Sequence, residues 1–112
     1  MNKDLEGFEK VCNIDMLEEK IGKKFFVDDI EIAVFKVDGN VYAVSNICPH
    51  QKVHLIYDGY VDGERVNCPI HGWQFNLKDG RLPGGGRGLS SYPVKIVNGD
   101  VYIKVVKKEL QW

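Results

Sequence analysis

Four side chains of the types that bind transition metals lie in two short segments of the chain. The first segment is Cys48-Pro49-His50, and the second is Cys68-Pro69-Ile70-His71-Gly72-Trp73. Each supplies one thiolate and one imidazole, with one residue between them in the first segment and two in the second. A thiolate must be deprotonated and an imidazole neutral to bind metal, so such residues gather where a cation offsets their desolvation. The candidate ligands are therefore Cys48, His50, Cys68 and His71.

The pairing of the ligand types separates two kinds of metal centre. Tetrahedral zinc sites with two Cys and two His ligands are common, but zinc fingers pair Cys with Cys and His with His. In this chain each segment is mixed, and the first has a single spacer residue. This favours a binuclear centre, in which each segment gives a thiolate to one metal and an imidazole to the other, as in a [2Fe–2S] cluster with two His on one iron. A structural zinc module that mediates protein contacts stays open as the alternative.

Length and composition indicate one small domain with no signal for nucleic-acid or membrane binding. The 112 residues carry a formal net charge of −1, without the basic patch that nucleic-acid binding needs. The longest apolar runs have about four residues, far fewer than the ~20 of a membrane span. Residues 1–6 mix both charges and lack an apolar signal-peptide core, and three cysteines do not suggest a disulfide framework. We therefore expect a cytoplasmic protein.

Short runs rich in Val, Ile, Tyr and Phe alternate with turn residues, which predicts an all-β fold. Asp38-Gly39 and Asn98-Gly99 each separate two such runs and are typical of tight hairpins. A helical turn is expected near residues 15–18, with Asp15 as its cap and Glu18 reciprocating. The expected strands cover residues 9–12, 25–27, 31–37, 41–44, 94–97 and 101–105.

The pattern of the chain changes in its middle part. Between residues 45 and 92 the strands shorten, while Gly, Pro and the candidate ligands concentrate. This predicts a metal-binding subdomain over residues 45–92, inserted into a β base formed by residues 1–44 and 93–112. The sequence has no nucleotide-binding fingerprint and no second iron site with two His and one carboxylate, so we expect no catalysis within this chain.

The chain resembles a Rieske ferredoxin of the soluble, disulfide-free, low-potential kind. Both ligand segments carry the resemblance, together with Gln74-Phe75, Asp79-Gly80, Tyr92-Pro93-Val94 and the hairpin over residues 33–44. It implies a Rieske iron–sulfur fold, with an antiparallel β-sandwich or barrel base and an inserted cluster-binding subdomain. It also implies one [2Fe–2S] cluster per chain, with the inner iron held by Cys48 and Cys68 and the outer iron by His50 and His71.

The function implied by the resemblance is one-electron transfer. An electron would arrive from a reductase, expected to contain flavin, and leave at His50 and His71 toward a terminal oxygenase or another acceptor. The chain would then be the ferredoxin component of an aromatic-ring oxygenase system. A small subunit or domain of a nitrite reductase-like complex is the alternative, because the ligand motif is common to both settings.

Sequence differences from high-potential Rieske proteins indicate a low reduction potential. Those proteins have an added cysteine in each ligand segment, forming a disulfide, where this chain has Val53 and Ile70. They also have a serine and a tyrosine where this chain has Trp73 and Phe75. Hydroxyl donors to sulfur stabilise the reduced cluster, so their absence places the expected potential low in the range of roughly −150 to +300 mV.

The remaining candidate residues are expected not to be ligands. His54 is expected to be a surface or loop-packing histidine, and Cys12 a buried free thiol in the first strand. Trp73 and Phe75 are expected to pack under the second ligand segment. The glycines 84–86, after Pro83, match either the third, proline-containing loop that covers Rieske clusters or an ordinary flexible turn.

Overall fold

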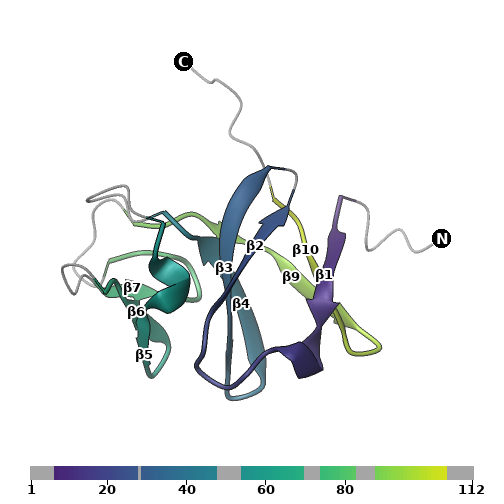
Figure 1. Ribbon diagram of the computed structural model, residues 1–112, viewed down its shortest axis with the longest axis horizontal. Helices are drawn as coiled ribbons and strands as arrows, with labels where there is room; N and C mark the ends of the chain where they lie inside the picture. Colours follow the sequence, from purple (N-terminus) through teal and green to yellow (C-terminus); the bar gives the residue numbers. More distant parts are fainter. Residues whose placement is uncertain (1–6, 28, 48–53, 70–73, 83–87, 106–112) are drawn as a thin grey trace.

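The computed structural model describes residues 7–27, 29–47, 54–69, 74–82 and 88–105. Within these residues the chain forms three antiparallel sheets and two single-turn 3₁₀ helices, which confirms the predicted all-β class. The sheet that contains β2, β3 and β4 lies between the other two (Figure 1). No helix in the described part of the chain is long and apolar enough to span a membrane.

The three sheets have simple antiparallel orders. The first is β1-β10-β9, formed by Glu9–Asn13, Asp100–Ile103 and Val94–Val97. The second is β2-β3-β4-β8, formed by Lys23–Val27, Ile30–Val37, Asn40–Ser45 and Ser91–Tyr92. The third is β5-β6-β7, formed by Tyr60–Asp62, Arg65–Asn67 and Gln74–Asn76. The 3₁₀ helices are η2, Ile14–Met16, and η3, Ile56–Asp58.

Strand β3 connects the two hydrophobic cores of the protein. Successive side chains of a strand point to opposite faces of its sheet, and both faces of β3 are covered by other elements. Ile32 and Val34 pack into one core with side chains from β1 and β10, whereas Ala33, Phe35 and Val37 pack into the other core with side chains from the third sheet. The unbroken apolar run of β3 is therefore the pattern of a strand buried on both faces.

Both predicted hairpins are confirmed. Asp38 and Gly39 have φ values of 52° and 83°, and Asn98 and Gly99 have φ values of 53° and 83°. Two consecutive residues with positive φ form the turn whose twist matches that of the flanking strands, and Asn, Asp and Gly tolerate this conformation best. The first hairpin sets the register of β3 and β4, with Val37 opposite Asn40, so that β4 leads directly into the first ligand segment.

The predicted helical turn is displaced toward the N-terminus. It is the 3₁₀ helix η2, and its cap is Asn13 rather than Asp15, because the Asn13 side chain accepts a hydrogen bond of 2.9 Å from the Asp15 amide. Strand β1 already ends at Asn13, so the chain turns earlier than the capping pattern at Asp15 suggested. The last predicted strand is also shorter than expected, since β10 ends at Ile103.

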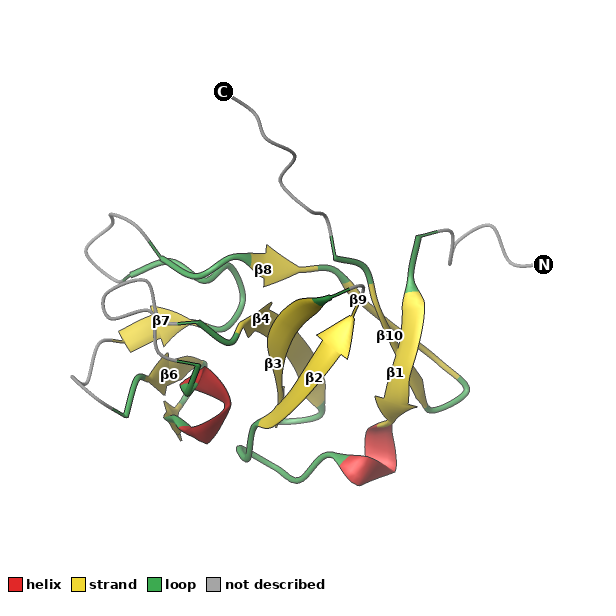
Figure 2. Cartoon of the chain, turned by 45° about the horizontal axis from the view of Figure 1, so that its top comes forward, coloured by secondary structure: helices red, strands yellow, loops and turns green. Residues whose placement is uncertain are grey.

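The middle part of the chain contributes all three strands of the third sheet. Strands β5, β6 and β7 lie within the predicted subdomain over residues 45–92, and Figure 2 shows them beside η3. β8 pairs with β4 of the second sheet through Ala43 opposite Tyr92, which returns the chain to the base. The division into base and subdomain stays a prediction.

Candidate metal centre

One of the four predicted ligands, Cys68, lies in the described part of the chain. The ligand set therefore stays a prediction, although the described residues show how the ends of both ligand segments are held. The following predicted features lie outside the described residues: Cys48, His50 and His71 as ligands, Val53 and Ile70 at the disulfide positions, the packing of Trp73, and the loop of glycines 84–86.

The second ligand segment connects two paired strands. β6 and β7 are antiparallel, with Asn67 opposite Gln74, so residues 68–73 begin and end at neighbouring positions. Cys68 directly follows β6 and has 2% of its surface exposed. It belongs to the same core cluster as Val66 and Phe75. The β6–β7 hairpin thus fixes the start of the segment, and Phe75 is fully buried in the same core as Cys68, which is consistent with its predicted packing role.

The first ligand segment is closed at its base by Asn46, which is fully buried. Its backbone amide donates to the Glu31 carbonyl at 3.3 Å, and its own carbonyl accepts from the Ile56 amide at 3.3 Å. Its side-chain oxygen accepts from the Tyr57 amide at 2.7 Å, and its side-chain nitrogen donates to the His54 carbonyl at 3.1 Å. Asn46 therefore links the chain before residues 48–53 to the chain after them.

Gly59 allows η3 and β6, which are next to the two ligand segments in the sequence, to pack against each other. It ends η3, which follows the first segment, and it lies against β6, which precedes the second. A Cβ at this position would lie 2.5 Å from the Asn67 carbonyl oxygen and 2.8 Å from Cγ2 of Val66. No larger residue fits without displacing backbone, so Gly59 allows the end of η3 to lie close against β6.

Gly80 holds the chain on both sides of residues 83–87. Its φ of +76° lies in the left-handed region, and a Cβ at this position would lie 2.0 Å from the Leu89 carbonyl oxygen. Its amide donates to the Asn76 carbonyl at 2.6 Å, and its carbonyl accepts from the Leu89 amide at 2.7 Å. These bonds connect the end of β7 to the chain that leads into β8. Gly80 belongs to the Asp79-Gly80 motif of the Rieske resemblance, whereas neither Asn46 nor Gly59 belongs to a motif that the sequence shows.

The two described cysteines differ in their surroundings. Both thiols are buried and neither forms a disulfide. Cys12 lies in the core between the first and second sheets, where burial raises the pKa of its thiol and the charge of Lys23 partly offsets this effect. Cys68 lies at a strand end, at the start of a ligand segment. A soft thiolate at such a buried position fits an iron–sulfur centre, because the metal offsets the cost of burying its charge. The predictions for Cys12 as a buried free thiol and for Cys68 as a ligand are both consistent with this placement.

His54 is exposed, as predicted, and pairs with a carboxylate. Its Nδ1 lies 2.9 Å from Oε1 of Glu31, whose side chain is only 10% exposed. Burial opposes ionisation of Glu31, but hydrogen bonds from His54 and Asn46 outweigh it and hold the pKa of this carboxyl below its ordinary value. The Asn46 side-chain nitrogen donates to Oε2 of Glu31 at 2.5 Å. Glu31 thus contacts residues on both sides of the first ligand segment.

The lowered pKa of Glu31 predicts a loss of stability in acid. A carboxyl whose pKa is lower in the folded chain than in the unfolded chain contributes stability above its ordinary pKa, which is 4.5 for glutamate. This contribution disappears as the pH falls through the folded-state pKa. We expect the free energy of unfolding, measured by urea denaturation from pH 7 to pH 3, to fall less steeply in acid for Glu31→Gln than for the wild type. Parallel curves for the two proteins would contradict this assignment.

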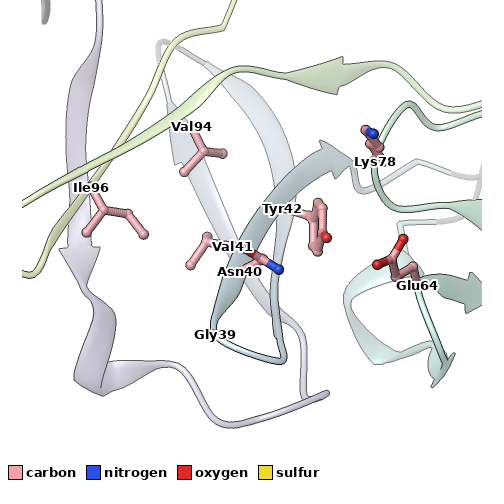
Figure 3. A pocket seen from close by; sticks show the side chains of 8 residues that line it. All are labelled: Gly39, Asn40, Val41, Tyr42, Glu64, Lys78, Val94 and Ile96. Atoms are coloured by element: carbon pink, nitrogen blue, oxygen red, sulfur yellow. The ribbon is translucent and has the colours of Figure 1, made fainter.

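A separate cleft of about 440 Å³ lies between the third sheet and the rest of the molecule. Figure 3 shows Val94 and Ile96 on one side and Glu64 and Lys78 on the other, with Tyr42 between them. Burial raises the pKa of the Tyr42 hydroxyl, and the carboxylates of Glu64 and Asp38 add to this effect. Cys68, the predicted ligand that the structure describes, is not among the described residues that line this cleft.

Comparison with known proteins identifies the class of this fold and site. The Rieske [2Fe-2S] domain family matches residues 7–93, and the chain belongs to this family. The chain is therefore a [2Fe–2S] protein, which confirms the expected cofactor and fold and disfavours the zinc alternative.

Particular relatives refine this assignment. The ferredoxin component of the naphthalene 1,2-dioxygenase system from Pseudomonas putida is 34% identical over 101 residues, which cover 88% of this chain and 95% of that protein. The crystal structure of a putative NADH-dependent nitrite reductase small subunit from Mycobacterium tuberculosis has a TM-score of 0.83 and 26% identity, covering 88% of this chain and 95% of that one. A complex of reduced oxygenase and oxidised ferredoxin in carbazole 1,9a-dioxygenase contains a chain with a TM-score of 0.78 and 26% identity, covering 88% and 93% of the two chains.

Proposed function

We propose that this protein is a one-electron carrier that passes electrons from a reductase to a terminal oxygenase. The supporting observation is its correspondence to the ferredoxin component of the naphthalene 1,2-dioxygenase system, over 95% of that relative's length. The match covers 88% of this chain, so the similarity extends well beyond the two ligand segments. The similarity to a ferredoxin found in complex with its oxygenase supports an oxygenase as the acceptor.

Four residues form the proposed ligand set. Cys48 and Cys68 would hold one iron, and His50 and His71 would hold the other. A [2Fe–2S] cluster with these ligands accepts and releases one electron. The described residues fix the position of one of these ligands: Cys68 directly follows β6 of the β6–β7 hairpin, and the core that includes Phe75 shields it from water.

The proposed donor is a reductase that contains flavin, and the proposed location is the cytoplasm. The formal net charge of −1 gives the chain no strong field to attract a partner from a distance. We therefore expect a small, transient interface with the reductase and the oxygenase, and an association rate that depends only modestly on salt.

The function is tested by purifying the protein and following electron transfer directly. An intact protein is reddish-brown, bleaches with dithionite, and contains iron and acid-labile sulfide in equal amounts. Stopped-flow mixing with a flavin-containing reductase and NADH should bleach it, and a terminal oxygenase should then restore the colour. A colourless protein with one zinc ion per chain would refute the electron-carrier function and revive the structural zinc module.

A nitrite reductase complex is the second candidate setting, supported by the similarity to the nitrite reductase small subunit. In that setting the electron path stays inside one enzyme complex. The two settings differ in a simple observation: affinity purification at native expression levels would retain a large reductase subunit in a stable stoichiometric complex. An independent carrier would elute alone and exchange electrons in transient encounters.

The reduction potential is expected to lie in the low part of the Rieske range, which extends from roughly −150 to +300 mV. The chain has Val53 and Ile70 at the disulfide positions and Phe75, without a hydroxyl, at the tyrosine position. Fewer donors to sulfur leave the added electron less stabilised. A spectroscopic redox titration of the purified protein measures the midpoint directly. A midpoint in the upper part of the range would overturn this expectation.

A further inference from the structure

The strongest unassigned feature is a group of three polar side chains at the base of the first ligand segment. Asn46 is fully buried, Glu31 has a side chain that is 10% exposed, and His54 is largely exposed at 55%. We call these residues the stem clamp. Buried polar groups cost free energy unless they are hydrogen-bonded, so a network of this kind is retained only where its bonds are made.

The bonds of the stem clamp converge on Glu31. Its carbonyl accepts from the Asn46 amide, its Oε2 accepts from the Asn46 side chain, and its Oε1 lies 2.9 Å from Nδ1 of His54. Asn46 is on the chain before residues 48–53, and His54 is the first described residue after them. The two oxygens of one carboxylate therefore contact residues on the two sides of the first ligand segment, Asn46 before it and His54 after it.

Glu31 is itself held firmly. It lies in β3, opposite Phe26 of β2, and the next residue, Ile32, pairs with Ser45 at the end of β4. β3 has paired neighbours on both sides and is buried on both faces, so it is among the most constrained strands of the described chain. A carboxylate on such a strand is a fixed point against which the loop ends are positioned.

We infer that Glu31 is a positioning residue for the iron–sulfur centre. Its carboxylate, through Asn46 and His54, sets the separation of the two ends of residues 48–53 and hence the placement of Cys48 and His50. The inference rests on the proposed ligand set. It differs from a role in general stability, because the contacts of Glu31 are with Asn46, before the ligand segment, and His54, after it, and its side chain does not join the hydrophobic cores.

The test uses the holoprotein and three variants. Glu31→Ala removes both side-chain contacts, and Glu31→Gln keeps an oxygen that can accept from Asn46 but removes the charge. Asp100→Ala is the control, since it removes a charged pair, Lys10–Asp100 at 3.5 Å, and a hydrogen bond from Asn13 in the first sheet, away from the stem clamp. The readouts are the g-values of the reduced protein in electron paramagnetic resonance and the half-time of iron loss to a chelator.

We expect Glu31→Ala to lose iron about tenfold faster than the wild type and to shift the g-values, which is the lower end of the roughly 10–100-fold effects seen when groups that directly support metal ligands are mutated. Glu31→Gln should lie between Glu31→Ala and the wild type, and Asp100→Ala should match the wild type. Wild-type g-values and iron-loss rates in Glu31→Ala would overturn the inference, as would equal changes in Glu31→Ala and Asp100→Ala.

A second variant keeps the test decisive if Glu31→Ala does not fold. His54→Ala removes only the contact between the exposed His54 ring and Glu31, and it leaves the buried hydrogen bonds of Asn46 in place. His54→Ala should also lose iron faster than the wild type, but by a smaller factor than Glu31→Ala. If His54→Ala and Glu31→Gln both lose iron at the wild-type rate, the inference is refuted. A wild-type protein without iron and sulfide would instead refute the proposed function itself.

Discussion

Replacing Cys68 with alanine should give a folded, colourless protein that contains neither iron nor acid-labile sulfide. The thiolate of Cys68 is one of two proposed for the inner iron, and a cluster that loses one of its four protein ligands is not retained. The substitution removes only a sulfur atom from a buried site, so the secondary structure should be preserved. Iron and sulfide analysis, with circular dichroism of the same sample, measures both parts of the expectation.

Cys12→Ala is the matched control for this experiment. Cys12 is also a buried free thiol, with 5% of its surface exposed against 2% for Cys68, but it lies in the other core. We expect Cys12→Ala to keep the full complement of iron and sulfide. A Cys68→Ala protein that retains its visible spectrum, or a Cys12→Ala protein that loses it, would show that the ligand set is wrong.

The second large effect is expected from Phe75→Ala. Phe75 is fully buried in the core that contains Cys68, Val66 and Ile56, and so it packs where the supports of both ligand segments meet. Truncating a buried phenylalanine costs about 3–5 kcal/mol, from lost burial and from the cavity that remains. Since small domains have a total stability of about 5–15 kcal/mol, this loss should lower the urea midpoint severely and accelerate loss of the cluster.

Phe26→Ala is the control for that measurement. Phe26 lies in β2 with 64% of its surface exposed, so the same side chain is removed from solvent instead of from a core. Its effect on the free energy of unfolding should stay within about 0.5 kcal/mol. Similar losses of unfolding free energy in the two variants would mean that the buried Phe75 side chain does not stabilise the core that contains Cys68.

Local sequence determined the features that depend on neighbouring residues. Asp38-Gly39 and Asn98-Gly99 specify their turns because these residue types tolerate positive φ. The alternation of Val101 and Ile103 with Tyr102 places the first two in the core. The sequence predicts the wrong cap for η2 because Asn13 and Asp15 both have side-chain acceptors, and the end of β1 at Asn13 decides which one is used. The mixed Cys and His pairs predicted the family because few other metal centres use one thiolate and one imidazole at this spacing in each segment.

The tertiary structure alone decided how the ends of the ligand segments are held. Nothing in the sequence around Glu31 connects it to Asn46 or His54, which lie 15 and 23 residues further along the chain. The pairing of β3 with β4 brings Asn46 beside Glu31, because register fixes which residues of distant segments meet, and the hydrogen bond from the Asn46 side chain to the His54 carbonyl places His54 there as well. Gly59 likewise has no local signature, since its need for a missing side chain comes from the backbone of β6. The ligand types could thus be recognised from the chain itself, whereas the residues that support them depend on contacts between segments that only folding brings together.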